Sequence, residues 1–597
     1  MKKRDLRIDF LKGIAILGVV VFHFSSDYLP YGYLGVDIFL VIIGYLMMKG
    51  IFSSMKREDF SYWRYLIKRC VRLWPLVLLM GIIALSLGYF LMLPDDYENV
   101  SESVIASNFF ANNILASITT RNYWNVSNTY RPLMHTWYLG ILMQAYIIFP
   151  IFIICCNKVS HNNKNVLKWF LALLTMASLI AYLLPFSSAS SKFYYLPYRT
   201  FELTLGALIA FVPFKKIKLS LLFEIICTAI LIGLLCINSD VISSPIKLII
   251  TCFSTAYLLF IFQNTQDNVP SIGNILAFLG KCSLSIYLCH QVIVAFMFYS
   301  ITDKINMKTF ALFILVVLVL SVFLYNFVEK PISRFAKNQK RENVIVILCA
   351  IVALFVSCVA GLIYMNAGVV RDIPEQGITR TNVHRGMHAE YCDKPYAWDV
   401  DFRDSGKTKI IVFGNSFGRD WANVLAESKI ADKIEISYIY PHSKDDLIER
   451  EKRLQDADFM FWAIGPGYGD IPEYVKEIIP LEKLYIVGNK SFGKSNGLIY
   501  AHRNSANYLN QTYKLPIELL NHDEQMKAKY ADRYIDLIDV VEKQPGEVIV
   551  FTPEGKFISH DCIHFTQFGA QYYAQSIDLS WLIKERSVKQ ASSKLPS

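Results

Sequence analysis

The chain has 597 residues, of which 54% are hydrophobic and 18% are charged, whereas soluble proteins average about 25% charged residues. Residues 1–370 hold 31 Lys and Arg against 17 Asp and Glu, and residues 371–597 hold 29 against 33. This composition argues against a purely soluble protein, and the slightly acidic C-terminal part argues against a nucleic-acid-binding role inferred from the overall positive charge.

Residues 10–364 contain apolar stretches of about the 20 residues that a membrane-spanning helix needs. The eleven stretches are 10–26, 33–52, 73–93, 136–156, 166–185, 198–214, 219–237, 246–263, 274–300, 308–328 and 343–364. The first run has no small-residue cleavage site and is followed by further apolar runs, so we do not interpret it as a signal peptide. The sequence predicts a multi-pass α-helical membrane domain of about eleven helices, surrounded by membrane lipids.

Lys and Arg gather in every second connection between these stretches. The clusters lie within residues 2–7, 56–72, 158–168, 215–218 and 334–341. Because cytoplasmic loops carry the excess of Lys and Arg, the pattern predicts a cytoplasmic N-terminus. With eleven helices, it also places the C-terminal part on the outer face of the membrane, in the periplasm or the exterior.

The first apolar stretch keeps two ionisable residues, Lys12 and His23. On a helix they lie within about 20° of one face and roughly 16 Å apart along the axis. Ionisable groups inside spans are costly and point to function. The alternative is a snorkelling Lys and a His that only packs between helices.

Several ordered motifs of residues 8–340 resemble those of the acyltransferase family 3 membrane proteins. The motifs are Ile8–Ala15 with Phe22-His23, Gly35–Phe39, Lys68–Pro75, His135-Thr136-Trp137, Arg199–Leu203 with Gly206, Ser283–His290 and Glu329-Lys330-Pro331. Members of this family move an acyl group, usually acetyl, from a cytoplasmic donor to a carbohydrate outside. The resemblance implies a bacterial inner (cell) membrane enzyme with acetyl-CoA as donor and no metal.

The same resemblance assigns roles to individual residues. His23 is the predicted catalytic residue of the membrane domain. Lys12, which stands where the family usually has Arg, is predicted with Arg69 and Arg72 to bind the coenzyme A phosphates. Positive-inside topology alone would also place cations there.

Three further matches are candidates for a substrate or structural role: His135, Arg199 and Glu202. The family usually continues after the His-Thr-Trp motif with Ser and a pair of Glu before Gln. This chain has Tyr138 to Gln144 with no carboxylate, so we transfer no acid or base role to that helix.

The C-terminal part alternates short apolar runs with helical patterns. Ile410–Phe413 is typical of a buried parallel strand; Gly414-Asn415-Ser416 and a helical stretch to Glu427 follow it, an arrangement that exposes a nucleophile. The further predicted strands are Ile434–Tyr440, Phe459–Ile464, Leu484–Val487 and Val548–Phe551, and the further predicted helices are Leu447–Gln455, Tyr474–Ile479 and His522–Val541. We predict a doubly wound parallel sheet with helices on both faces.

Near the end of the chain, Asp561 and His564 are spaced so that the carboxylate can orient the imidazole as a base for Ser416. Together with Gly-Asn-Ser, this spacing resembles the SGNH hydrolase fold. In that family Asp is commoner at the position that Asn415 occupies here. Val487–Gly493, which includes Asn489, also resembles a segment of SGNH domains fused to such membrane domains. The oxyanion block is expected near Gly465-Pro466-Gly467. A catalytically inactive binding module is the alternative.

Cys392 and Cys562 are the only two cysteines of the predicted outer domain. Because that compartment is oxidising, we predict a disulfide between them. Two buried free thiols are the alternative.

These features predict four segments: the acyltransferase domain (1–340, ten helices), the eleventh helix (341–365), a periplasmic extension (366–406) and an SGNH-like catalytic domain (407–597). The predicted function is O-acetylation of a cell-envelope polysaccharide, with lipopolysaccharide O-antigen ranked ahead of peptidoglycan on resemblance alone. The alternatives are a polysaccharide transporter with an accessory binding domain and an esterase that removes acetyl groups.

Overall fold

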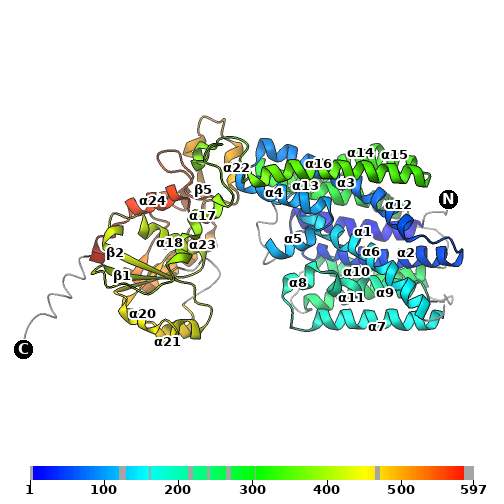
Figure 1. Ribbon diagram of the computed structural model, residues 1–597, viewed down its shortest axis with the longest axis horizontal. Coiled ribbons are helices and arrows are strands. Elements are labelled where there is room, and N and C mark those ends of the chain that lie inside the picture. The colour runs from blue at the N-terminus through cyan, green and yellow to red at the C-terminus, as the bar shows by residue number, and fades with distance from the viewer. Residues whose placement is uncertain are drawn as a thin grey trace, which may run out of the picture. The chain divides into compact units, whose positions relative to one another are not determined.

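The computed structural model describes residues 5–119, 130–159, 163–212, 220–237, 242–263, 271–302, 304–463, 465 and 471–583. The chain forms two compact units (Figure 1). The helical unit comprises Met1–Met92 and Asp96–Tyr364, and the C-terminal unit comprises Leu93–Asp95 and Met365–Ser597.

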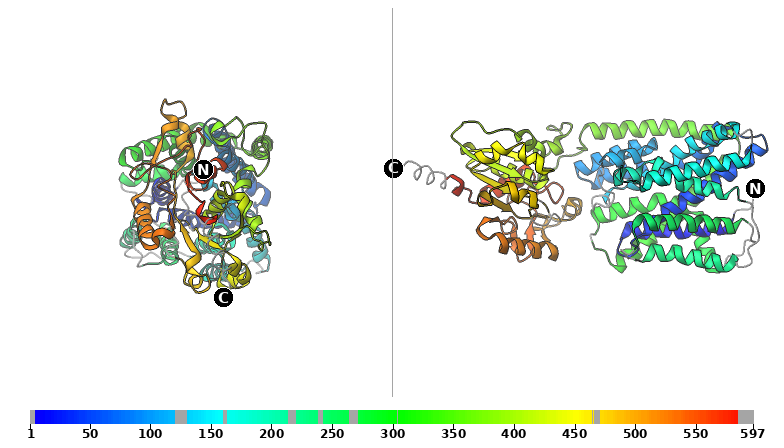
Figure 2. Two further views of the ribbon diagram at one scale, coloured as in Figure 1. Left: turned by 90° about the vertical axis from the view of Figure 1, so that its left-hand side faces the viewer. Right: turned by 90° about the horizontal axis from the view of Figure 1, so that it is seen from below.

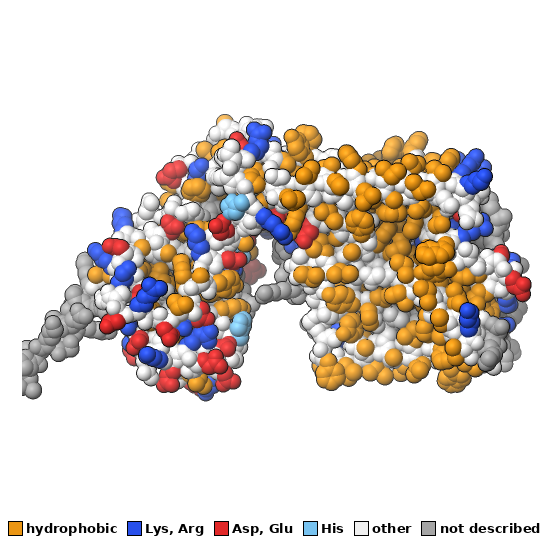
Figure 3. Space-filling view, in the orientation of Figure 1, with side chains coloured by type: hydrophobic (Ala, Val, Ile, Leu, Met, Phe, Trp, Pro, Cys, Tyr) orange, Lys and Arg blue, Asp and Glu red, His pale blue; other side chains and the backbone are white. Residues whose placement is uncertain are grey.

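The long helices of the helical unit run roughly parallel to one another (Figure 2). In chain order the helices are α1 (Leu6–Phe24), α2 (Gly35–Lys56), α3 (Tyr62–Leu91), α4 (Pro94–Asn108), α5 (Asn112–Thr119), α6 (Trp137–Val159), α7 (Lys164–Leu183), α8 (Ala189–Tyr194), α9 (Leu196–Ile209), α10 (Ser220–Cys236), α11 (Ser244–Phe262), α12 (Ser271–Lys281), α13 (Ser283–Ser300), α14 (Met307–Leu324), α15 (Lys330–Phe335) and α16 (Gln339–Met365). On the face shown in Figure 3, hydrophobic side chains cover this unit, and Lys and Arg gather toward one end.

Within the described residues, eight helices are long and apolar enough to cross a membrane. The multi-pass helical membrane domain is thus confirmed, whereas the count of eleven spans is not. Each predicted stretch contains a helix, but α9 has only 14 residues, α10 has 17, and α1 carries three charged residues in its first half. The stretch 274–300 divides at Cys282 into α12 and α13.

Glycines let two pairs of helices approach closely. A Cβ on Gly13 of α1 would lie 2.1 Å from the Leu276 carbonyl oxygen of α12, and one on Gly44 of α2 would lie 1.9 Å from the Leu203 carbonyl oxygen of α9. Small residues at such crossings allow the backbones to touch, as is common in membrane bundles. The second contact brings the polar residues of α9 against those of α2.

The C-terminal unit contains a five-stranded, wholly parallel sheet in the order β2-β1-β3-β4-β6. Its strands are β1 (Thr408–Phe413), β2 (Ile434–Ile439), β3 (Phe459–Trp462), β4 (Leu484–Val487) and β6 (Tyr534–Ile535). Ile410 and Val412 pack into one hydrophobic core, and Ile411 and Phe413 pack into a second. Since successive side chains of a strand point to opposite faces, both faces of the sheet are covered, and the predicted parallel sheet is confirmed.

Helices surround this sheet, and a small antiparallel sheet accompanies it. The helices are α17 (Met387–Asp393), α18 (Ser416–Ala426), α19 (Lys444–Ile448), α20 (Glu451–Asp456), α21 (Glu473–Ile478), α22 (Asn496–Ala501), α23 (Ile517–Tyr530) and α24 (Gln567–Ser576). The small sheet has the order β5-β8-β7, from β5 (Thr512–Lys514), β8 (Glu547–Ile549) and β7 (Glu542–Gln544).

Two elements of the predicted sheet were wrong. Only the first two residues of the run 548–551 lie in a strand, β8, and that strand pairs antiparallel with β5 rather than joining the parallel sheet. The fifth parallel strand, β6, lies inside the predicted helix 522–541, where α23 ends at Tyr530. With only two half-buried residues, β6 has no apolar run that a pattern could detect.

Candidate active site

Ser416 lies at the carboxyl end of β1, where the strand turns directly into α18. The turn requires Gly414, which has a φ of +140° and whose Cβ would lie 1.8 Å from the Ala463 carbonyl oxygen. The Asn415 side chain accepts a hydrogen bond of 3.0 Å from the Phe417 amide and so caps the helix. Ser416 is therefore the first residue of a helix, where free amides and the helix dipole favour negative charge.

The structure brings Ser416 together with His564 and Asp561, 145 residues and more away along the chain. The His564 Nε2 atom lies 2.7 Å from the Ser416 Oγ atom, and its Nδ1 atom lies 2.6 Å from an Asp561 carboxylate oxygen. The other Asp561 oxygen accepts hydrogen bonds from the Ile563 and His564 amides. This geometry allows His564 to take a proton from Ser416 while Asp561 orients the ring.

The charge state of Asp561 suits that orienting role. Burial acts to raise the pKa of this carboxyl, but the neighbouring His560 and the hydrogen bonds from His564 hold its pKa well below the usual range. Asp561 is therefore ionised at neutral pH and can accept the hydrogen bond from His564 Nδ1.

The predicted disulfide is not formed: Cys392 and Cys562 are both free cysteines. Cys562 has a left-handed φ of 71°, and its buried thiol donates to the Asn496 side-chain oxygen at 2.9 Å. The Cys392 Sγ atom instead lies 3.2 Å from His560 Nε2. Burial acts to lower the pKa of His560, but Asp561 and Cys392 raise it to about 10, so a charged imidazolium faces the Cys392 sulfur.

The predicted oxyanion region is described only in part. Gly465 faces the first turn of α18, since its Cβ would lie 2.5 Å from the Phe417 ring; residues 466 and 467 lie outside the described residues. The Asn489 side chain is directed to another residue: its nitrogen lies 3.0 Å from His522 Nδ1. The Ser416 amide at the helix start remains the candidate oxyanion donor.

In the helical unit, His23 meets two further histidines. Its Nδ1 atom lies 3.2 Å from His290 Nε2 and 2.9 Å from the Val19 carbonyl oxygen of its own helix. The His135 and His290 rings have centroids 5.4 Å apart, and the Tyr287 hydroxyl donates to the His135 carbonyl oxygen. His290 was not among the sequence candidates, although a buried histidine in the apolar stretch 274–300 was a usable signal.

Arg199 and Glu202 form a buried charge cluster with Asp37. One Arg199 guanidinium nitrogen lies 2.6 Å from an Asp37 oxygen and 3.0 Å from a Glu202 oxygen. Asp37, Arg199 and His23 line one small cavity of about 10 Å³, together with aromatic side chains that include Trp137. The cluster therefore brings one carboxylate group and one guanidinium group to the wall of the cavity that His23 also lines.

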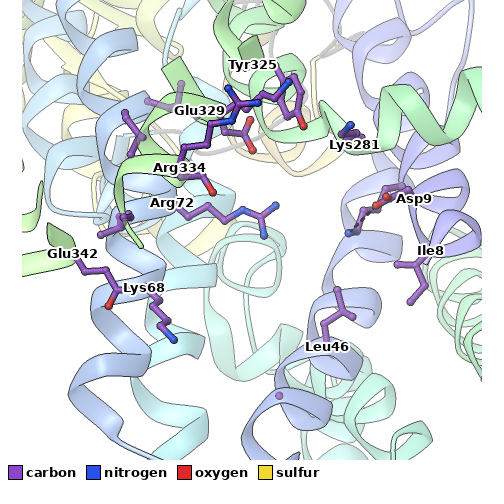
Figure 4. Close-up of a pocket in the computed structure, with 18 of the residues that line it drawn as sticks. Ile8, Asp9, Leu46, Lys68, Arg72, Lys281, Tyr325, Glu329, Arg334 and Glu342 are labelled. Carbon is purple, nitrogen blue, oxygen red and sulfur yellow. Dashed lines mark hydrogen bonds and ion pairs between the residues drawn. The ribbon is translucent and has the colours of Figure 1, made fainter. Parts of the chain in front are cut away.

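A cavity of about 1180 Å³ opens at the end of the helical unit where the N-terminal part of α1 lies. Eight Lys and Arg and four Asp and Glu line it among the described residues, Lys12, Lys68, Arg72, Lys281 and Arg334 being five of the cations. Arg72 extends into the cavity toward the wall that carries Lys281 and Asp9, and Lys12 pairs with Asp9 at 3.5 Å (Figure 4). Such a surplus of cationic donors suits a phosphorylated ligand.

A second cavity of about 100 Å³ shares wall residues with the cationic cavity and with the small cavity at His23. It shares Lys12 and Arg72 with the cationic cavity and Tyr287 with the small cavity at His23. Arg69 lines this second cavity only, with its guanidinium 4.8 and 4.9 Å from the Tyr65 and Tyr146 rings. Tyr287 therefore separates the second cavity from the small cavity at His23, and Lys12 and Arg72 lie between the second cavity and the cationic one.

Comparison with known proteins gives the helical unit a family. The family model described as an acyltransferase domain, of acyltransferase family 3, matches residues 5–326, more than half of the chain. The O-acetyltransferase OatA of Staphylococcus aureus strain MRSA252 is 26% identical over 381 residues, which cover 58% of this chain and 62% of that protein. A putative O-acetyltransferase of strain COL is 25% identical over 351 residues, which cover 55% of this chain and 57% of that protein.

The chain thus spans about three fifths of the length of the curated relatives that it matches. No solved structure matches it. The family match covers the motifs around Lys12, His23, His135 and Arg199, as well as the histidine at position 290. The chain belongs to the acyltransferase 3 family.

Proposed function

We propose that this protein is an O-acetyltransferase that moves acetyl from acetyl-CoA to a hydroxyl of a cell-envelope polysaccharide. The observation that carries the proposal is the hydrogen-bonded Ser416–His564–Asp561 arrangement in a chain whose membrane unit belongs to an acyltransferase family. A transporter with a binding domain has no use for that arrangement. An esterase has no use for the membrane unit and its cationic cavity.

Acetyl-CoA binds in the cationic cavity, with its phosphates held by Arg72 and the surrounding lysines. The narrower second cavity receives the thiol-bearing arm and directs the thioester toward His23. The Lys and Arg of this end mark the cytoplasmic side. The helix α16 begins at this end, where Glu342 lines the cavity, and is long enough to cross the membrane before the C-terminal unit begins, so that unit works outside the cytoplasm.

His23 acts as the general base of the first transfer. It takes the proton of the accepting nucleophile as that nucleophile attacks the thioester, and the proton leaves with the coenzyme A thiol. The carboxylate of Asp37, held by Arg199, lines the same cavity as His23 and can interact with the transient imidazolium.

The C-terminal unit completes the reaction by the chemistry of an SGNH-type domain. Ser416, deprotonated by His564, attacks the acetyl group on the first acceptor and takes it as an ester, while the first acceptor leaves with the proton from His564. His564 then takes the proton of a sugar hydroxyl that attacks this ester, and returns that proton to the departing Ser416 oxygen. The amides at the start of α18 stabilise the oxyanion in both steps. Asn415 serves as the helix cap, so Asp is not needed at that position.

The acceptor is a polysaccharide of the bacterial envelope, with lipopolysaccharide O-antigen and peptidoglycan as the two candidates. Measuring O-acetyl groups in separately purified O-antigen and peptidoglycan, from cells with and without the gene, distinguishes them. Acetyl loss confined to one fraction identifies the acceptor, and unchanged acetylation of every envelope glycan contradicts the proposal.

The first prediction concerns the binding of acetyl-CoA in the cationic cavity. Arg72→Ala should raise the KM for acetyl-CoA about tenfold with little change in kcat, because a charge-assisted contact to phosphate contributes about 1.5–3 kcal/mol. Arg341→Ala is the matched control, since Arg341 stacks on Phe335 and does not line the cavity. Equal KM values for the Arg72→Ala and Arg341→Ala proteins would remove Arg72 from the donor site.

The second prediction concerns the length of the acyl group that the small cavity at His23 accepts. A cavity of about 10 Å³ holds roughly one water-sized group, which favours acetyl over longer acyl groups. Trp137, whose ring lies 4.5 Å from that of Phe193, forms part of its wall.

Trp137→Ala should therefore raise the ratio of kcat/KM for butyryl-CoA to that for acetyl-CoA at least about tenfold, measured as coenzyme A release by membranes that contain the acceptor glycan. Trp169→Ala, which removes a Trp 76% exposed on the same unit, is the control. An unchanged ratio in Trp137→Ala would show that this wall does not select the acyl group.

A further inference from the structure

A buried ion pair lies directly behind the Ser416 helix. The Lys490 Nζ atom is 2.7 Å from an Asp420 carboxylate oxygen, and the two side chains are only 1% and 2% exposed. Asp420 lies one turn after Ser416 on α18, and Lys490 follows the end of β4 by three residues. The pair therefore joins the nucleophile helix to the carboxyl edge of the sheet.

The same two side chains also hold the backbone on both sides of His564. Lys490 Nζ donates to the Ile563 carbonyl oxygen at 2.6 Å, and the Phe565 amide donates to Asp420 at 3.3 Å. Ile563 and Phe565 are the immediate neighbours of His564. One ion pair thus contacts the helix that carries the nucleophile and the loop that carries the base.

Aromatic rings enclose the Lys490 ammonium group. Its Nζ atom lies 4.0 Å from the centre of the Phe417 ring and 4.7 Å from the centre of the Phe565 ring. Phe417 follows Ser416, and its ring centre lies 6.2 Å from that of His564. The cation is therefore fixed by two rings, a carboxylate and a carbonyl, and a shift of Lys490 would disturb both Ser416 and His564.

Burial of such a pair is poor evidence for a stabilising role, because desolvation of two charges offsets much of their attraction. The geometry of the pair is better explained by a role in positioning the catalytic residues. The His564 loop contains Cys562 at a positive φ and an exposed side chain at Ile563. Anchors outside the loop are therefore needed to keep His564 Nε2 at hydrogen-bond distance from Ser416.

We propose that Lys490 and Asp420 are positioning residues for catalysis by the C-terminal unit. They fix the peptide groups on both sides of His564 relative to α18, and so keep the base in line with the nucleophile. This inference rests on the proposed role of Ser416 and adds the residues that set its geometry.

The test uses the full-length protein in detergent and two readouts: hydrolysis of p-nitrophenyl acetate, and the rate at which a fluorophosphonate probe labels Ser416. Lys490→Met should lower kcat and the labelling rate about 100-fold, since misplacement by about 1 Å costs that much, while KM stays within about twofold. Asp420→Asn, which is nearly isosteric, should lower kcat in the same way. It replaces Lys490→Met in the test if that variant does not fold.

Arg453→Met is the matched control. Arg453 is a mostly buried cation of the same unit that pairs with Asp399 and Asp401 and contacts no residue of the catalytic group. Its kcat and labelling rate should equal those of the wild-type protein. A loss in Arg453→Met as large as in Lys490→Met would show a general structural effect and overturn the inference.

The positioning role of Lys490 and Asp420 and the catalytic role of Ser416 are tested separately. The positioning role alone is overturned if Lys490→Met or Asp420→Asn folds and keeps the wild-type kcat while the Ser416→Ala protein is inactive. Full hydrolysis by Ser416→Ala overturns the proposed function, and the positioning role with it.

Discussion

Ser416→Ala should abolish O-acetylation of the envelope glycan, and His564→Ala should do the same. Removing a catalytic Ser or His of this kind costs on the order of 10³-fold or more in rate, because Ser416 forms the acetyl ester and His564 takes its proton. The contacts of 2.7 Å between Ser416 and His564 and 2.6 Å between His564 and Asp561 are the basis for this expectation. Acetyl groups released from purified glycan by mild base measure the effect.

Ser428→Ala is the control for this experiment. Ser428 is a buried serine just beyond α18 whose hydroxyl donates to the Leu425 carbonyl oxygen, away from His564. Protein levels in membranes must match for all variants. Near-normal glycan acetylation in Ser416→Ala cells would rule out a covalent role for this serine.

His23→Ala should also stop glycan acetylation, but for a different reason. The variant cannot transfer acetyl from the coenzyme A thioester, whereas its Ser416 site remains intact. The full-length His23→Ala protein should therefore still cleave p-nitrophenyl acetate at a rate within about twofold of wild type, while acetylation in cells falls at least about 100-fold.

His502→Ala is the matched control for His23→Ala. Its ring Nδ1 atom contacts the carbonyl oxygen four residues earlier at 2.9 Å, as His23 does, but His502 is exposed and lies in the C-terminal unit. This control is expected to keep both activities. If His23→Ala also acetylates glycan normally, the histidine only packs between helices.

The parts of the catalytic group that could be predicted from sequence are those with local patterns. Ile410–Phe413 is a buried run followed by Gly-Asn-Ser, and the structure contains β1, its turn and α18 there. Asp561 and His564 are three residues apart, so their mutual contact followed from spacing alone. Their approach to Ser416 followed only from assuming a fold that joins both ends of the unit.

What could not be predicted depends on contacts between distant segments. Lys490 lies in the segment Val487–Gly493 that resembles SGNH domains, but its role could not be inferred there, since it comes from Asp420, Ile563 and Phe565 in two other segments. The disulfide prediction failed because two cysteines in one compartment need not face each other. Cys562 turns its thiol inward to Asn496, whereas Cys392 contacts His560.

In the helical unit, too, local patterns could be predicted from sequence and contacts between distant segments could not. Apolar length predicted where helices form, but it could not separate full spans from α9, which is shorter than a bilayer requires. Lys12 and His23 were correctly placed on α1, yet the row of cavities between them depends on side chains from α2, α3, α6 and α13.

The most direct test of the two-site transfer is to follow the acetyl group itself. Membranes containing the wild-type protein, the His23→Ala protein or the Ser416→Ala protein are incubated with radiolabelled acetyl-CoA without added glycan acceptor, and the label is then located by peptide mapping. We predict base-labile label on the peptide containing Ser416 in the wild-type protein, and none there in either variant. Label on that peptide in the His23→Ala protein, or none in a wild-type protein that still acetylates glycan, would contradict transfer from the membrane site to Ser416.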